Sequence, residues 1–299
     1  MDHVVEILQR SGGAADFAEL RRLVPVSTIR RALTLGQISR VSKGVYALPD
    51  GPSDIAVALA NGGVLSHESA ALHHGLDVVT MPLIPHVTIG RKFSKRDTEL
   101  ACTLHWAALP TGDGTDVSRP MATDPLRTVL DCARRLPFGE ALAVADSAVR
   151  LGKVNRKVLN ASALSLNGPG RPAAIRACSL ADGRAASALE SMLRSRVIEA
   201  GITGFIPQYV IRGPGFFARV DLGNPLLRIA IEADSFTHHA TREALRRDCR
   251  RYTSLAANGW LLLRYSWEDV ILDDSWVGDS LDRTITGSAA RQTLLHPAA

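Results

Sequence analysis

The residues best suited to chemistry lie between Arg219 and His239 of this 299-residue chain. Asp221 lies at the end of one short apolar run and Glu232 near the end of the next, with a Gly-Asn-Pro turn between the runs. Two strands joined by such a turn bring their acidic residues together at one edge of a sheet. Carboxylate oxygens gathered in this way suit a hard divalent cation such as Mg²⁺. We therefore expect Asp221 and Glu232 to be the ligands of a metal-dependent nuclease centre.

Further polar residues surround this pair. Glu190 lies beside the apolar stripe of a preceding helix, and Asp234, His238 and His239 directly follow the second strand. Bound Mg²⁺ (or Mn²⁺) lowers the pKa of a bound water and neutralises charge on a phosphate in the transition state. A nuclease needs both effects: water is a weak nucleophile unless its pKa is lowered, and the phosphate under attack is an anion whose charge must be neutralised.

A helix rich in arginine follows the two strands. Arg246 and Arg250, like Arg247 and Arg251, are spaced four residues apart and therefore stack on neighbouring helix faces. Beside a carboxylate cluster, such a ridge suits phosphate binding. The alternative is a solvated helix face whose charges pair internally with Glu243 and Asp248.

The elements that must position these residues follow from periodicity and turn chemistry. The pattern predicts the order helix, three strands, helix, strand, helix, which packs as a mixed sheet flanked by helices. In residue numbers, we expect a helix over 185–200, strands over 205–211, 216–222 and 227–234, a helix over 243–258, a strand over 260–265 and a helix from 267.

The first 50 residues predict three short helices followed by a hairpin, which is the order of a winged helix-turn-helix. The third helix would read a DNA groove, and the wing would contact phosphate. The predicted DNA-binding residues are Ser27, Thr28, Arg30 and Arg31 on that helix, and Arg40 and Lys43 on the wing. The alternative is a small helical domain whose basic residues are merely solvated.

The middle region combines helices with short strands. Ser66 is placed to cap a helix, 85–89 and 102–106 alternate as strands, and Asp124 opens another helix. His67, His73 and His74 have no acidic or cysteine partner at ligand spacing apart from Glu68, so we expect them to have helix-capping and core roles.

The fold class is therefore α/β, or α+β overall. It comprises an N-terminal winged helix-turn-helix (1–50), a middle α+β domain (51–152), a linker with some helix (153–182) and a C-terminal restriction-endonuclease-like mixed sheet flanked by helices (183–290). The length alone predicts more than one domain.

Composition indicates a folded cytoplasmic protein, and the predicted winged helix and nuclease centre make DNA the expected partner. The net charge is +5 and arginine far outnumbers lysine, which suits phosphate recognition, although a GC-rich genome has the same effect. The four cysteines are scattered, and neither a signal peptide nor an apolar run long enough for a membrane is apparent. The sequence identifies neither an oligomeric state nor a toxin or repair partner.

The first half of the chain resembles the AbiEi-type antitoxins and transcriptional regulators of bacterial abortive-infection systems. The resemblance depends on the wing followed by GGVLSHESAALHHGL (62–76), PHVTI (85–89) and TDPLRTVLDCARRLP (123–137). It implies a DNA-binding winged helix with an accessory domain, usually without enzymatic activity.

The C-terminal region resembles the Vsr-like endonucleases of the PD-(D/E)XK superfamily, relatives of very-short-patch repair enzymes. The blocks that carry the resemblance are RVDL (219–222), IEAD (231–234), HH (238–239), RRDCRR (246–251) and GWLLLRYSWEDV (259–270), together with Glu190 and Gln208. The resemblance implies Asp221 and Glu232 as metal ligands, Glu190 as a helix-borne support and Gln208 as an auxiliary group. It also implies His238 or His239 as an acid-base group or phosphate contact.

One position departs from the superfamily pattern. Asp234 stands two residues after the second acid, where the superfamily has a lysine. Asp234 is able to supply a further metal oxygen, and a histidine is able to replace the lysine. We therefore carry two functions forward: a Mg²⁺-dependent DNA endonuclease acting in repair or phage defence, and an antitoxin-like transcriptional regulator whose nuclease-like domain is catalytically impaired.

Overall fold

The computed structural model describes residues 3–51, 53–92, 96–109, 121–213, 215–234, 242–273 and 275–295. Two compact units are present: Met1–Leu76 with Thr80–Cys132, and Asp77–Val79 with Ala133–Ala299. Helices and strands are mixed in both units, which confirms the expected α+β class. The finer domain boundaries at residues 50, 152 and 182 stay predictions.

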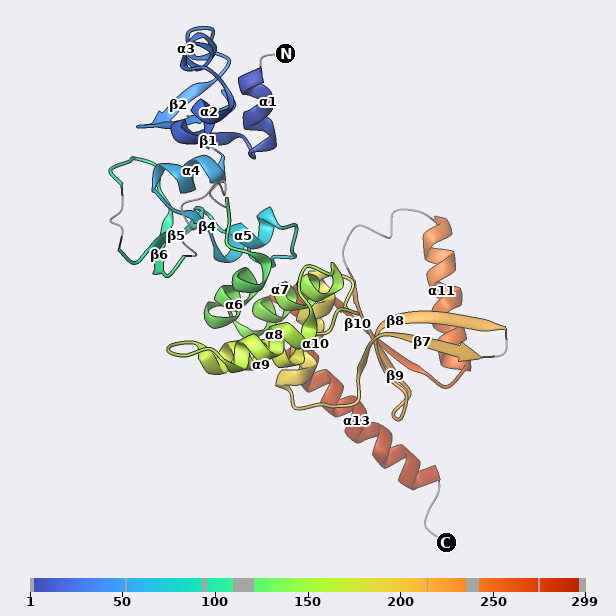
Figure 1. Ribbon diagram of the computed structural model, residues 1–299. Helices are drawn as coiled ribbons and strands as arrows, with labels where there is room; N and C mark the ends of the chain where they lie inside the picture. The colour runs from blue at the N-terminus through green and yellow to red at the C-terminus, as the bar shows by residue number, and fades with distance from the viewer. Residues whose placement is uncertain are drawn as a thin grey trace. The chain divides into compact units, whose positions relative to one another are not determined.

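The first unit begins with three helices and a three-stranded sheet (Figure 1). The elements are α1 (His3–Arg10), β1 (Ala14–Asp16), α2 (Phe17–Leu23), α3 (Val26–Thr34), β2 (Ser39–Ser42) and β3 (Val45–Ala47). The sheet has the order β1-β3-β2, and both strand pairs are antiparallel. This is the arrangement of a winged helix-turn-helix, with β1 as a strand that the sequence pattern did not predict.

Local chemistry explains how these helices begin. Asp16 is the N-cap of α2 and accepts a 2.8 Å hydrogen bond from the Glu19 amide, as expected for a carboxylate at that position. Pro25 precedes α3 and cannot continue α2 as a helix. These two residues set where α2 and α3 begin.

Helix α3 has one apolar face that is buried and one polar face that is exposed. Ile29 and Ala32 are buried in the core of the first unit, together with Leu8 of α1 and Leu20 of α2. The predicted DNA-facing residues are exposed or half-buried, and they are Ser27, Thr28, Arg30, Arg31, Arg40 and Lys43. Contact of these residues with DNA stays a prediction.

The remainder of the first unit has its own three-stranded sheet. Its elements are α4 (Asp54–Ala60), β4 (Val64–Leu65), α5 (His67–His73), β5 (His86–Gly90), β6 (Thr103–Ala107) and the start of α6 (Pro125–Arg135). The order is β4-β5-β6, with β4 antiparallel and β6 parallel to β5. Ser66 is the N-cap of α5 as predicted, but its hydroxyl contacts His67 Nδ1 at 3.0 Å and makes no capping bond to the helix.

Three helices begin the second unit. They are α7 (Phe138–Arg150), α8 (Arg156–Leu164) and α9 (Arg171–Leu180), and α9 packs on both α7 and α8. The segment predicted as a linker with some helix therefore contains two packed helices. Within the described residues, no helix is long and apolar enough to cross a bilayer.

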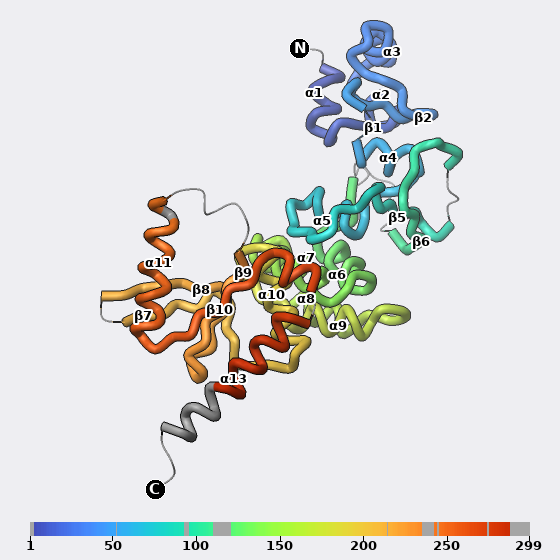
Figure 2. Tube along the Cα trace, turned by 180° about the vertical axis from the view of Figure 1, so that it is seen from behind, coloured from blue at the N-terminus to red at the C-terminus, as the bar shows by residue number. Residues whose placement is uncertain are grey.

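The rest of the second unit is a four-stranded sheet with helices on both sides (Figures 1 and 2). Its elements are α10 (Ala188–Glu199), β7 (Ile206–Gly213), β8 (Phe216–Asn224), β9 (Ile229–Asp234), α11 (Arg242–Ala257), β10 (Leu261–Ser266), α12 (Trp267–Ile271) and α13 (Trp276–Leu295). The order along the chain is the predicted one, with a further helix at the end. Strand order is β10-β9-β8-β7, in which only the β9–β10 pair is parallel.

Each face of this sheet has its own apolar layer. Leu193 of α10, Val270 of α12 and Leu281 of α13 pack on the face that carries Ile229 and Ile231. On the opposite face, Leu255 of α11 packs in one cluster with Ile211, Val220 and Ala230. Within β9, Ala230 lies between Ile229 and Ile231 and therefore faces the other side of the sheet. The sheet is thus buried on both sides, which holds its strand ends in fixed positions.

A buried ion pair holds α10 against α7. Asp146 is fully buried, and both of its carboxylate oxygens accept from Arg194 Nη2, at 2.8 and 2.9 Å. Burial raises the pKa of Asp146, although Arg194, the Asp182 amide and the Ser191 hydroxyl all oppose this effect. Helix α10 carries Glu190, so this pair also fixes one of the predicted site residues.

We predict that Asp146→Ala lowers the free energy of unfolding by about 3–5 kcal/mol, because Arg194 is left buried without its carboxylate. Urea unfolding of the whole chain measures the loss. Asp146→Ala with Arg194→Met should recover most of it, since no uncompensated charge remains. The matched control is Arg184→Ala, which breaks an exposed pair with Asp182 and should cost at most about 1 kcal/mol. Equal losses for the two single variants would contradict the prediction.

Candidate carboxylate site in the second unit

Three of the predicted site residues are joined by one side-chain amide. Gln208 Nε2 donates to Glu190 Oε2 at 2.7 Å and lies 3.5 Å from Asp221 Oδ1. Asp221 Oδ2 accepts a 3.0 Å bond from the Ala233 amide on the next strand. Helix α10 and strands β7, β8 and β9 therefore meet at this point, as the sequence order predicts for Glu190, Asp221 and the end of β9.

The backbone is irregular where this contact forms. Gln208 lies between the antiparallel pairs Pro207↔Leu222 and Tyr209↔Val220, opposite Asp221. Its φ of 51° is uncommon for any residue other than glycine. Across from it, Val220 packs on the α11 side of the sheet and Leu222 on the other side, so the alternation of β8 is interrupted at Asp221. Such local strain is typical of positions where a side chain is aimed at a site.

Glu190 has a structural role as well as its place in the cluster. Ser187 is the N-cap of α10 and accepts from the Glu190 amide at 3.2 Å. The Glu190 carboxylate in turn accepts from the Ala186 amide at 2.8 Å, so the two side chains together satisfy the start of the helix. This capping fixes the carboxylate beside Gln208 and accounts for its position without any ligand.

The carboxyl group of Asp221 is the one whose ionisation is most affected. Its burial raises its pKa to about 7, and the negative charges of Glu190 and Glu232 act in the same direction. The Ala233 amide and Arg251 oppose the rise but do not cancel it. Near neutral pH the Asp221 carboxyl group is therefore partly protonated, and a cation bound beside it would favour its ionised form.

Glu232 is held by Arg251, which the sequence predicted to bind DNA. Arg251 of α11 donates to both Glu232 oxygens, one of them at 2.8 Å, and to the Arg219 carbonyl at 2.8 Å. Glu232 is only 8% exposed, so its charge needs a partner of this kind. The sequence predicted Arg251 as a DNA-binding residue; its contact with Glu232 could not be foreseen, because helix packing decides which arginine faces the sheet.

Asp234 also has an arginine partner. Its Oδ2 lies 2.6 Å from Arg264 Nη2 on the parallel strand β10, and the Arg264 guanidinium lies over the Tyr252 ring. Arg264 is in register with Glu232. A cation therefore stands near the position where the superfamily pattern has its lysine, although a different strand supplies it.

The remaining predicted residues fall in two groups. Arg246, Arg247 and Arg250 are exposed on α11, as phosphate binding requires. His238 and His239 lie outside the described residues, so their roles stay predictions. Contact of the three exposed arginines with DNA is a prediction as well.

Two sets of donor atoms are suited to a metal. Asp221 and Glu232 offer hard oxygen atoms, which Mg²⁺ and Mn²⁺ prefer. In the described part of the first unit, ligand atoms of His67, His86 and His105 all lie within 4.8 Å of one another. The sequence had predicted a core role for His67, and its burial agrees; the two other histidines come from separate strands and no local spacing indicated them.

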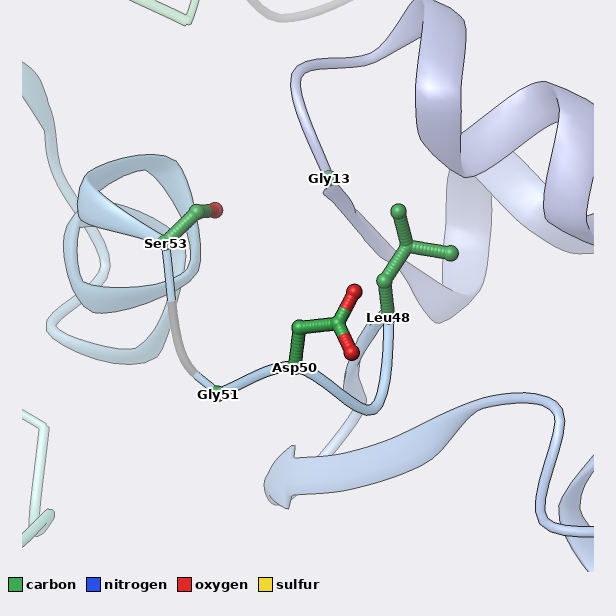
Figure 3. A pocket seen from close by; sticks show the side chains of 5 residues that line it. All are labelled: Gly13, Leu48, Asp50, Gly51 and Ser53. Atoms are coloured by element: carbon green, nitrogen blue, oxygen red, sulfur yellow. The ribbon is translucent and has the colours of Figure 1, made fainter.

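A cavity of about 500 Å³ in the first unit is lined by Gly13, Leu48, Asp50, Gly51 and Ser53 (Figure 3). Ser53 is the N-cap of α4 and accepts from the Ala56 amide. Among the described residues that line it, Asp50 is the one titratable group, and the Ser53 hydroxyl is used in capping α4. This cavity lacks the set of groups that catalysis needs.

Comparison with known proteins gives relatives without a known activity. No family model matches the chain. Two uncharacterised proteins of Mycobacterium tuberculosis, MT2308 (strain CDC 1551 / Oshkosh) and Rv2248 (strain ATCC 25618 / H37Rv), are each 36% identical over 156 residues. The match covers 52% of this chain and 58% of each relative, so the chain spans little more than half the length of the relatives it matches.

Two solved structures are similar over parts of the chain. The catalytic domain of the homing endonuclease I-Bth0305I has a TM-score of 0.28 and 16% identity, over 33% of this chain and 95% of that chain. The RV2827C protein from Mycobacterium tuberculosis has a TM-score of 0.33 and 16% identity, over 71% and 87%. TM-scores this low establish neither a shared fold nor a shared activity. The resemblances to the AbiEi-type and Vsr-like families stay predictions.

We predict that Asp221→Asn stabilises the chelator-treated protein at about pH 8, by on the order of 2 kcal/mol. The pKa of Asp221 is about 7 when folded and about 4 when unfolded. The folded state thus holds the proton more tightly, and its stability falls as pH rises from about 4 to about 7. The amide of the variant cannot ionise, so the gain should shrink towards about pH 5.

Thermal unfolding at several pH values, with a chelator present, measures this difference. Asp282→Asn is the matched control, because Asp282 is exposed on α13, away from the carboxylates. A gain that is the same at every pH, or one that the control shares, would contradict a raised pKa of Asp221 in the folded state.

Proposed function

We propose that the second unit is a metal-dependent DNA endonuclease centre and that the winged helix of the first unit binds DNA. One observation carries this proposal: the carboxylates of Glu190 and Asp221 meet at Gln208, the charge of Glu232 also acts on Asp221, and the buried Asp221 has a pKa of about 7. Acidic groups that repel one another destabilise a fold, so a cluster of this kind is expected where a cation is to be bound.

In this proposal two carboxylates bind the metal, and two further side chains position them. Asp221 and Glu232 hold Mg²⁺ or Mn²⁺, for which their oxygen donors fit. When bound, the metal supplies a water of lowered pKa and neutralises phosphate charge. Gln208 orients the carboxylates of Glu190 and Asp221 through its amide. Arg251 keeps Glu232 in place from the α11 side.

The cations near the site have the task of binding the substrate. Arg246, Arg247 and Arg250 are exposed on α11 and contact backbone phosphates. Arg264 brings a guanidinium to the end of β9, beside Asp234. Because an arginine stays protonated, it stabilises a developing anion but does not act as a base, so the proton of the attacking water has to leave by another group.

The test is incubation of the purified whole chain with duplex, mismatched and single-stranded DNA in Mg²⁺ or Mn²⁺. We expect metal-dependent cleavage that Asp221→Ala with Glu232→Ala reduces to background, because both ligands are lost. Asp282→Asn should cleave like the unchanged protein. Cleavage that survives in the double variant comes from a contaminating nuclease and contradicts the proposal.

A second candidate function is an antitoxin-like transcriptional regulator with an impaired nuclease-like unit. The observation that favours it is the pairing of Glu232 with Arg251 and of Asp234 with Arg264. Acids that already have arginine partners need no metal for charge balance. In this case the first unit binds a promoter site and the second unit serves as a clamp or partner module.

This second function predicts sequence-specific, salt-sensitive DNA binding without cleavage. Arg30→Ala with Arg31→Ala should weaken binding and lower the slope of log affinity against log salt by roughly two, because each arginine neutralises one phosphate. The assay is fluorescence anisotropy at several salt concentrations, with exposed Arg10→Ala of α1 as the control. Unchanged binding by the double variant would exclude α3 as the reading helix.

A further inference from the structure

Three histidines from three separate elements meet inside the first unit. His67 is the first residue of α5, His86 is the first residue of β5, and His105 lies within β6. One ligand nitrogen from each lies within 4.8 Å of the others. The parallel register pairs Thr88 with His105, which places His86 and His105 on the same face of the sheet.

Their nitrogen atoms are spaced almost as the ligands of one ion would be. His86 Nδ1 and His105 Nε2 are 3.1 Å apart, and the His67 and His105 ring centroids are 3.8 Å apart. Two imidazole nitrogens on a tetrahedral Zn²⁺, each about 2.0–2.1 Å from the ion, are separated by about 3.3 Å. The His86 and His105 nitrogens are already close to that separation, and the His67 ring, which stacks on His105, has a ligand nitrogen within 4.8 Å of both.

Burial and charge favour a dication at this point. His67 and His86 are 8% and 5% exposed, and His105 is half-buried. Imidazole binds a metal in its neutral form, so binding of an ion here would release protons at low pH. The open side at His105 gives an ion a path of entry.

Neighbouring polar groups complete the site. Glu68 is 6% exposed, and its Oε2 lies 3.6 Å from His86 Nδ1, on the side of the ring that faces His105. Its carboxylate supplies negative charge next to the predicted ion position. The Ser66 hydroxyl lies 3.0 Å from His67 Nδ1 and orients that ring, as outer partners of metal-bound histidines commonly do.

We infer that His67, His86 and His105 form a Zn²⁺ site, with Glu68 as the charge-balancing carboxylate. Neutral imidazoles select a borderline transition metal such as Zn²⁺ over Mg²⁺. The ion would link α5 to β5 and β6, in addition to the hydrogen bond from the His86 amide to Ser69 and the pairing of the two strands. This site is independent of the carboxylates of the second unit and of any cleavage activity.

The test uses the whole chain with any affinity tag removed, treated with a chelator and then titrated with Zn²⁺ against a chromophoric competitor. We expect about one Zn²⁺ per chain, a higher temperature of unfolding with Zn²⁺ than with chelator, and no displacement by excess Mg²⁺. Glu68→Gln should weaken Zn²⁺ binding at least about tenfold. His105→Gln, at the half-buried position, should abolish tight binding.

The control variants separate this site from the rest of the chain. His73→Gln alters an exposed histidine of α5 outside the cluster and should bind Zn²⁺ like the unchanged protein, as should Asp282→Asn. If His105→Gln does not fold, Co²⁺ binding to the unchanged protein gives a visible absorption band that reports a tetrahedral site of nitrogen and oxygen ligands. Absence of tight Zn²⁺ binding by the unchanged protein, or its retention in a folded His105→Gln, overturns the inference.

Discussion

Repulsion among carboxylates is the constraint around which the second unit is built. Glu190, Asp221 and Glu232 are brought together by elements that approach from different directions, and each must be held against the charge of the others. Hydrogen bonds from Gln208 and from the Ala233 amide do this for Asp221, and Arg251 does it for Glu232. Burial, together with the charges of Glu190 and Glu232, nevertheless raises the pKa of Asp221 to about 7.

The support for this cluster extends well beyond the groups that touch it. Ser187 caps the helix that carries Glu190, and the buried Asp146–Arg194 pair holds the same helix against α7. Apolar layers on both faces of the sheet fix β8 and β9. In the first unit, by contrast, the clustered groups are imidazoles. Imidazole nitrogens prefer Zn²⁺ and carboxylate oxygens prefer Mg²⁺ or Mn²⁺, so the two proposed sites would select different cations.

Local patterns were enough to predict most of the elements, because alternation, helical periodicity and turn residues act over short stretches, but they missed β1 and the two packed helices of the predicted linker. The order of helices and strands in the second unit, the cap at Asp16 and the proximity of Asp221 to the end of β9 all follow from them. Contacts chosen by tertiary packing could not be predicted in this way. Arg251 reaches Glu232 rather than solvent, Arg264 reaches Asp234, and His86 and His105 join His67 across a sheet whose register the sequence does not state.

The parallel pairing of β9 with β10 has a consequence for how this protein can change. Parallel neighbours require a crossover connection, and here that connection is α11, the helix that bears the arginine ridge. The arginines of α11 therefore lie on a helix that the fold needs. Deleting α11 would also remove the connection to β10, the strand at the edge of the sheet. The positive charge of this helix is therefore expected to change by substitution of its arginines and not by loss of the helix.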